Sequence, residues 1–137
     1  MLRRDAKLDL LRKVPLFERC SKGELVRIAG LADELEVPAG KELTQEGRTG
    51  YEFVVLVDGM AEVRRKGRRV NLLYSGDFLG EIALITGAPR TATVTTTVPS
   101  EVLVITARDF RRLLRETPTI QLKVLEALAA RLPDEAA

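Results

Sequence analysis

Short segments of alternating apolar and polar residues, separated by glycine- and proline-containing turns, constrain the fold of this chain more than any other feature. From about residue 33 the apolar positions recur every second residue, which is typical of a β-strand with one buried face. The pattern predicts strands over 35–37, 51–57, 60–65, 70–74, 91–97 and 101–105. Turn signals such as Asp58-Gly59 and Lys66-Gly67 separate them. Many short strands at this spacing indicate a mainly β sandwich, barrel or jelly roll.

Helical signals lie on both sides of this β-rich region. Before it, Ser21 and Glu24 have the spacing of a capping box, and an apolar face follows at Leu25, Ile28, Ala29 and Ala32. After it, Thr106 is a candidate N-cap with Asp109 three residues on, and Thr117 precedes a proline at the first helical position. We expect the last helix to bury one apolar stripe before Pro133 ends it: Gln121, Val124, Leu125, Leu128 and Leu132.

A chain of 137 residues is long enough for one domain with a substantial core. We expect a single domain over 1–137, with N-terminal helices over 1–32, the β-rich part over 33–105 and C-terminal helices over 106–132. No apolar run reaches the roughly 20 residues that cross a bilayer, and the amino terminus has no signal-peptide core. With a single cysteine, Cys20, the expected compartment is the cytoplasm.

The absence of histidine excludes several functional classes. The chain contains no histidine and one cysteine, so it offers no histidine general base, no Ser-His triad and no imidazole or thiolate metal site. Metal-dependent enzymes that share a β-roll architecture therefore do not fit. We expect no catalytic residues, no metal and no cofactor. The net charge of +2 is too balanced to indicate nucleic-acid binding by itself.

Residues 80–92 carry the clearest functional signal. Gly80 permits close approach of a ligand to the backbone, and Glu81 supplies an acceptor carboxylate at the start of a short predicted helix. After a Gly-Ala-Pro corner, Arg90 supplies a rigid fork of donors suited to phosphate oxygens. Either charged residue alone is an ordinary surface residue. Together they fit a ligand that has both a phosphate and a sugar hydroxyl.

This segment closely resembles the phosphate-binding cassette of cyclic nucleotide-binding domains, whose fold is a β-roll flanked by helices. The resemblance covers nearly the whole chain. It includes Val14-Pro15-Leu16-Phe17, Glu46-Gly47, Asp58-Gly59 and the run from Gly76 to Glu81. It implies a sensor of a 3′,5′-cyclic nucleotide, cAMP or cGMP, rather than an enzyme.

The resemblance also implies roles for individual residues. Glu81 is expected to bind the ribose 2′-hydroxyl and Arg90 the phosphate. Additional phosphate contacts are expected from Thr91, Ala92 and the backbone amides of Ile82 and Ala83. In this family a threonine after the arginine often accompanies cGMP preference, but hydroxyl residues occur there in cAMP binders too. We favour cAMP.

The base of the nucleotide needs an apolar slot. Val63 and Leu79 are the candidates for its walls. Asn71 stands where relatives usually have an apolar residue facing the base, although strand alternation favours an outward-facing side chain there. We expect ligand to draw the last helix over the base, with four candidate lid residues: Leu125, Leu128, Arg131 and Leu132.

The expected partners are the cyclic nucleotide and either a protein effector or a larger parent protein, and a homodimer is left open. No helix-turn-helix or other direct nucleic-acid module is evident, nor a membrane segment. The alternative function is a β-roll that binds no ligand and serves as a protein-interaction or assembly module. Binding of a nucleotide distinguishes the two.

Overall fold

The structure of the chain is a computed structural model that describes residues 3–81 and 83–130. It contains two compact units. One comprises Met1–Leu31 with Arg112–Ala137, and the other comprises Ala32–Arg111. The division falls within helix α4 (Ala107–Glu116).

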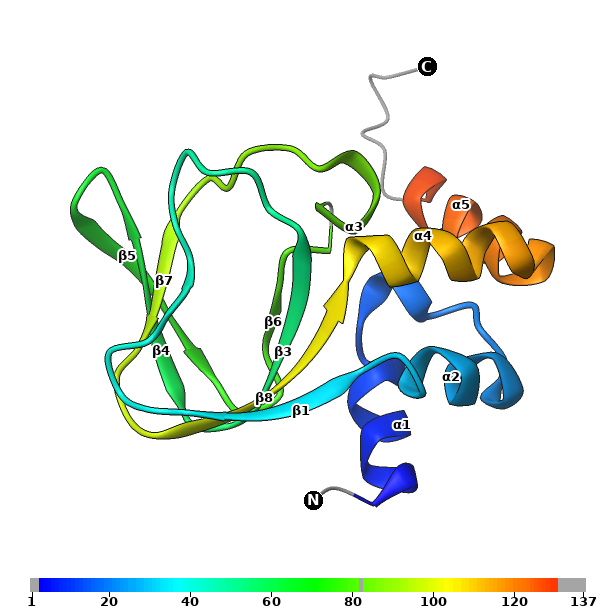
Figure 1. The fold of residues 1–137 in the computed structure, drawn as a ribbon, viewed down its shortest axis with the longest axis horizontal. Helices are drawn as coiled ribbons and strands as arrows, with labels where there is room; N and C mark the ends of the chain where they lie inside the picture. Colours follow the sequence, from blue (N-terminus) through cyan, green and yellow to red (C-terminus); the bar gives the residue numbers. More distant parts are fainter. Residues whose placement is uncertain (1–2, 82, 131–137) are drawn as a thin grey trace. The chain divides into compact units, whose positions relative to one another are not determined.

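The unit over residues 32–111 is built from two antiparallel four-stranded sheets (Figure 1). The first has the order β1-β8-β3-β6 and the second the order β2-β7-β4-β5. The strands are β1 (Asp33–Val37), β2 (Glu42–Thr44), β3 (Glu52–Asp58), β4 (Met60–Arg65), β5 (Arg68–Tyr74), β6 (Phe78–Leu79), β7 (Thr93–Thr96) and β8 (Ser100–Thr106). This arrangement of two antiparallel sheets is a β-roll, so the predicted mainly β fold class is confirmed.

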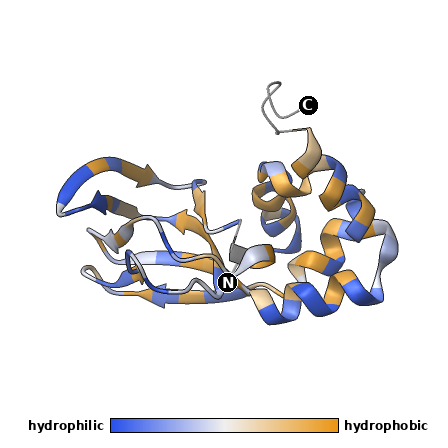
Figure 2. Cartoon of the chain, turned by 90° about the horizontal axis from the view of Figure 1, so that it is seen from above, coloured by the Kyte–Doolittle hydropathy of each residue, from blue (hydrophilic) through white to orange (hydrophobic). Residues whose placement is uncertain are grey.

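The core of this unit lies between the two sheets. Alternate residues of β3 and β8, including Val54 and Val104, form a buried cluster. Leu43 and Leu73, from the second sheet, pack against it. Figure 2 shows the corresponding alternation of hydrophobic and hydrophilic residues along the strands. The period of two in the sequence therefore marks the faces that meet in the core.

The β4–β5 hairpin closes with a two-residue loop. Lys66 and Gly67 both have positive φ angles, 52° and 77°. This is the pattern of a type I′ turn, whose twist matches that of the flanking strands. It fixes the register that pairs Arg65 with Arg68, and a bulge between Val63 and Arg64 follows.

The other unit is helical and contains α1 (Arg4–Arg12), the 3₁₀ turn η1 (Pro15–Phe17), α2 (Lys22–Ala29) and α5 (Pro118–Ala129). The capping box at the start of α2 is confirmed: the Glu24 amide donates to Ser21 Oγ at 3.2 Å, and the Ser21 amide donates to Glu24 Oε1 at 2.8 Å. Glu24 also forms an ion pair with Lys123 of α5.

Two helix predictions need correction. Proline does open α5, but the Thr117 side chain makes no capping hydrogen bond. The buried face of α5 is Ile120, Val124 and Ala127, whereas Gln121 and Leu125 are exposed. Because α5 carries apolar residues on more than one face, its sequence is compatible with two stripes. Leu132 and Pro133 lie outside the described residues.

The strand predictions were largely right, with two omissions. Strands β2 and β6 were missed because they span only three and two residues, too few to show alternation. The strand expected from Thr91 begins at Thr93. At the end of the roll, the predicted cap of α4 is present, with the Asp109 amide donating to Thr106 Oγ1 at 3.1 Å.

Candidate functional site

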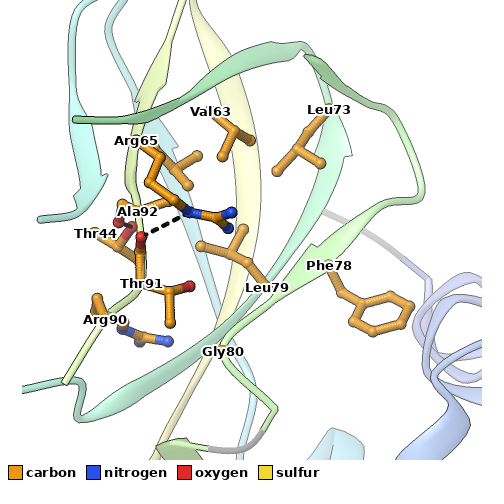
Figure 3. A pocket seen from close by; sticks show the side chains of 11 residues that line it. Thr44, Val63, Arg65, Leu73, Phe78, Leu79, Gly80, Arg90, Thr91 and Ala92 are labelled. Atoms are coloured by element: carbon orange, nitrogen blue, oxygen red, sulfur yellow. Dashed lines mark hydrogen bonds between the residues drawn. The ribbon is translucent and has the colours of Figure 1, made fainter. Parts of the chain in front are cut away.

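The predicted cassette borders a pocket of about 190 Å³ in the β-roll (Figure 3). The pocket draws residues from both sheets and from the segment that joins β6 to β7. Its lining consists of Thr44, Val63, Arg65, Leu73, Phe78, Leu79, Gly80, Arg90, Thr91, Ala92 and Val94. Six of the residues predicted from the sequence therefore share one cavity: Val63, Leu79, Gly80, Arg90, Thr91 and Ala92.

The backbone of Arg90 is held in a short antiparallel pairing with the segment before β3. The Arg90 amide donates to the Arg48 carbonyl and the Gly47 amide donates to the Arg90 carbonyl, both at 2.8 Å. One residue earlier, Pro89 forms a β-bridge with Thr49. Both backbone polar groups of Arg90 are thus satisfied locally, and the side chain starts from a fixed point.

Two glycines make room for the Arg90 side chain. A Cβ atom at Gly50 would lie 2.6 Å from Arg90 Cζ, and one at Gly80 would lie 3.0 Å from the same atom. Both distances are well inside van der Waals contact. Gly80 also has a φ angle of +85°, which other residues rarely adopt. We call this arrangement, Arg90 between Gly50 and Gly80, the arginine slot.

The guanidinium in the arginine slot is positioned by the protein itself. Its Nη2 donates a hydrogen bond to the backbone carbonyl of Glu52. Burial lowers the pKa of Arg90, an effect that the Glu52 carboxylate opposes. Arginine remains protonated under all ordinary conditions. The slot therefore presents a fixed cation at one end of the pocket.

Glu81 lies directly after the slot residue Gly80. It is half-buried, in a turn that precedes α3 (Ala83–Thr86), and it is not one of the residues that line the pocket. Ile82, a predicted backbone donor, lies outside the described residues. Ala83 is the first residue of α3, but this helix is a single turn, so little of a helix dipole can accumulate there. Arg90 therefore contributes more positive charge at this end of the pocket than the helix terminus does.

The opposite walls of the pocket are apolar. Val63 of β4 and Leu73 of β5 project into it from the second sheet, and Leu79 of β6 lies across from them (Figure 3). Asn71 is not part of this lining. It is exposed on β5, and its side-chain oxygen accepts a hydrogen bond from the Leu72 amide. The residue that β5 contributes is Leu73, two positions further along the strand.

Five lining residues were not identified from the sequence as site residues: Thr44, Arg65, Leu73, Phe78 and Val94. Thr44, on the missed strand β2, donates its hydroxyl hydrogen bond to the Ala92 carbonyl at 3.0 Å. Arg65 donates from Nε to the Thr91 carbonyl at 3.1 Å. The register of β4 could have indicated Arg65, because it lies two residues after Val63 and so shares its face.

The candidate lid residues belong to the helical unit. Leu125 is exposed and Leu128 half-buried on α5. Arg131 and Leu132 lie outside the described residues. Among the described residues, no helix combines the length and apolar character of a membrane span, and no three acidic or cysteine side chains are grouped as metal ligands.

The pocket thus has a cationic, donor-rich end and apolar walls. This combination suits a small ligand with an anionic group at one end and a flat, apolar or aromatic group at the other. Its polar donors come from guanidinium groups, which match the geometry of phosphate oxygens.

Comparison with known proteins agrees with this chemistry. Residues 34–117 match the model of the cyclic nucleotide-binding domain. A cAMP-dependent protein kinase regulatory subunit of Mycosarcoma maydis is 37% identical over 113 residues, which cover 76% of this chain and 22% of that protein. A cyclic nucleotide-gated potassium channel of Rhizobium etli is 34% identical over 112 residues, 82% of this chain and 31% of the channel. The chain therefore spans between a fifth and a third of the length of these relatives.

A similar fold occurs in a solved structure, the N-terminal domain of a transcriptional regulator from Streptomyces coelicolor A3(2). The two share 26% identity and a TM-score of 0.82, and the match covers 90% of each chain. The family match extends over more than half of the chain and includes the pocket and the arginine slot. On sequence and fold together, the chain belongs to the cyclic nucleotide-binding domain family.

Proposed function

We propose that this chain binds a 3′,5′-cyclic nucleotide as a regulatory sensor and catalyses no reaction. The observation that carries the proposal is the arginine slot at one end of a pocket whose walls include the apolar side chains of Val63, Leu73 and Leu79. The cyclic phosphodiester has one delocalised negative charge, which Arg90 would bind in this proposal. The base then occupies the apolar part, against Val63, Leu73 and Leu79.

The proposed ligand contacts come from the cassette, residues 80–92. Arg90 holds the phosphate, with further donors from the backbone near Gly80, Thr91 and Ala92. Glu81 accepts the ribose 2′-hydroxyl, because its carboxylate repels the phosphate and attracts a hydroxyl donor. Glu81 follows the pocket residue Gly80 in the chain, but Glu81 itself does not line the pocket. The proposal therefore requires the turn at Glu81 to move toward the ribose when ligand binds.

We propose cAMP as the preferred ligand. The support comes from relatives, since the regulatory subunit of Mycosarcoma maydis is named for cAMP dependence. The exposed hydroxyl of Thr91 is compatible with either base. The cation and the apolar walls recognise the phosphate and the flat ring system, which cAMP and cGMP share. A preference for cAMP must therefore come from contacts to the edge of the base.

The proposed signal is a movement of α5 when ligand binds, passed to an effector in the same or another protein. Ligand can shift such an equilibrium only by binding the two states with different affinity. Hydrogen exchange over residues 118–130 tests this step. Slower exchange with bound nucleotide is expected, and equal protection with and without nucleotide would reject the movement.

The decisive experiment is calorimetric titration of cAMP and cGMP into protein refolded free of bound nucleotide. Arg90→Ala should weaken binding by about 10- to 150-fold, because it removes a charge-assisted hydrogen bond of about 1.5–3 kcal/mol. Arg69→Ala is the matched control, since Arg69 is exposed on β5 outside the pocket. Equal affinity of the two variants would reject the assignment of Arg90. Absence of binding by the unaltered chain would favour the interaction-module alternative.

A further inference from the structure

A second arginine, from strand β4, reaches the same pocket. Arg65 is the last residue of β4, and its guanidinium lies over the pocket between Val63 and Leu79 (Figure 3). Strand alternation explains why. Ala61 and Val63 face the interior of the roll, so Arg65 shares their side, whereas Glu62 and Arg64 face outward.

The two neighbouring arginines differ in their charge environment. Arg64 forms an ion pair with Glu62 on the outer face. Within the described residues, Arg65 has no carboxylate partner, and its single hydrogen bond is from Nε to the Thr91 carbonyl at 3.1 Å. Glu46, in the loop between β2 and β3, accepts instead from the Lys66 amide at 2.9 Å.

The hydrogen bond through Nε orients the remaining donors of Arg65. A guanidinium has five N–H donors in a rigid fork. With Nε directed at Thr91, the two terminal nitrogens are turned away from that carbonyl and toward the pocket (Figure 3). Arg90, by contrast, already uses its Nη2 group to donate a hydrogen bond to the Glu52 carbonyl. The pocket therefore has unused donors on the β4 side.

The pocket as a whole has two cations and, among its described lining residues, no carboxylate. Two like charges around one small cavity repel each other, and an anion between them relieves that repulsion. Both are linked to the cassette next to Thr91: Arg90 precedes it in the chain, and Arg65 binds its carbonyl. Their shared target is thus at the anionic end of the ligand rather than at the base.

We propose that Arg65 is a second ligand-binding cation, which contacts the phosphodiester from the β4 side while Arg90 binds it from the cassette side. The proposal rests on the proposed function and extends it to a residue outside the cassette. Arg65 would also link the ligand to the β4–β5 hairpin, because it is the last residue of β4.

The test is calorimetric titration of cAMP and cGMP into the full chain and into Arg65→Gln. Arg64→Gln is the matched control, because it removes the same charge one residue away on the outer face. We expect Arg65→Gln to weaken both nucleotides by the same factor, roughly tenfold or more, and to flatten the dependence of affinity on salt. Arg64→Gln should change the affinity by less than about threefold.

Each other result has a distinct meaning. Unequal losses for cAMP and cGMP would overturn the proposal in favour of a contact to the base. Equal affinities of Arg65→Gln and Arg64→Gln would overturn it in favour of a purely structural bond to Thr91. If the unaltered chain binds neither nucleotide, the proposed function itself fails, and the Arg65 proposal with it. Circular dichroism of each variant establishes that the β-roll is intact.

Discussion

Replacing Gly50 with alanine should weaken ligand binding more than it lowers the stability of the fold. Gly50 is buried and does not need a positive φ angle, so its backbone accepts alanine. The added Cβ would lie 2.6 Å from Arg90 Cζ and 2.9 Å from Arg90 Cδ. Carbon atoms in contact are normally about 3.5–4.0 Å apart. The guanidinium must therefore move by about 1 Å, which its flexible side chain can do.

The expected magnitudes follow from that displacement. A shift of about 1 Å takes a phosphate hydrogen bond from about 2.8 Å to beyond hydrogen-bonding distance. Losing one charge-assisted bond weakens binding by about 1.5–3 kcal/mol, or roughly 10- to 150-fold. The fold loses at most the charge-assisted bond from Arg90 to the Glu52 carbonyl, about 1.5–3 kcal/mol, and regains about 0.4–1 kcal/mol because alanine restricts the unfolded chain.

Calorimetric titration and urea unfolding of Gly50→Ala measure the two quantities. Gly23→Ala is the matched control, because a Cβ there meets only Ser21 Oγ, at 4.0 Å. The control should bind ligand as the unaltered chain does. If Gly50→Ala binds normally, the arginine slot does not position the ligand cation. A loss of several kcal/mol in stability would instead show that the backbone requires glycine.

Two further predictions concern stability. Gly80→Ala should both weaken ligand binding and destabilise the fold by about 1–2 kcal/mol in urea unfolding, because Gly80 has a φ angle of +85° and its Cβ would lie 2.7 Å from the Glu52 carbonyl oxygen; unchanged stability would contradict this. Burial raises the pKa of Glu24, but hydrogen bonds from Lys123 and Ser21 outweigh it and lower that pKa from 4.5 to about 2. This stabilisation is present above about pH 4.5 and is lost as the pH falls toward 2. The Tm of the unaltered chain should therefore fall more steeply over that range than the Tm of Glu24→Gln, and parallel curves would exclude Glu24 as the cause.

Local patterns predicted the parts of the fold that local physics determines. The capping box at Ser21 and the cap at Thr106 depend on residues three apart, and both formed. Thr117 has the same local signal, but its side chain makes no cap. The sequence of α5 does not show which of its apolar faces is buried, because burial depends on which residues pack against the helix. Ile120 rather than Leu125 is buried.

The part of the candidate pocket that is contiguous in the chain was predictable, apart from Glu81, which lies outside the lining. Residues 80–92 form one motif, and Gly80, Arg90, Thr91 and Ala92 line one pocket. Gly50 has no local signal, since its role arises from a segment about 40 residues distant in sequence. Thr44 was missed with its short strand. Only the pairing of the 47–49 segment with the cassette shows why a glycine is needed at position 50.

The pairing of Arg90 with Gly47 and Arg48 has a consequence for the kinetics of recognition. Since the backbone at Arg90 is fixed on both sides, the proposed capture of ligand at this residue would require only that the guanidinium exchange a carbonyl partner for a phosphate. Side-chain rotations of this kind take picoseconds to nanoseconds, far less than a loop rearrangement. Encounter at Arg90 then proceeds without a slow opening step, and differences in affinity among ligands appear in how long each complex lasts.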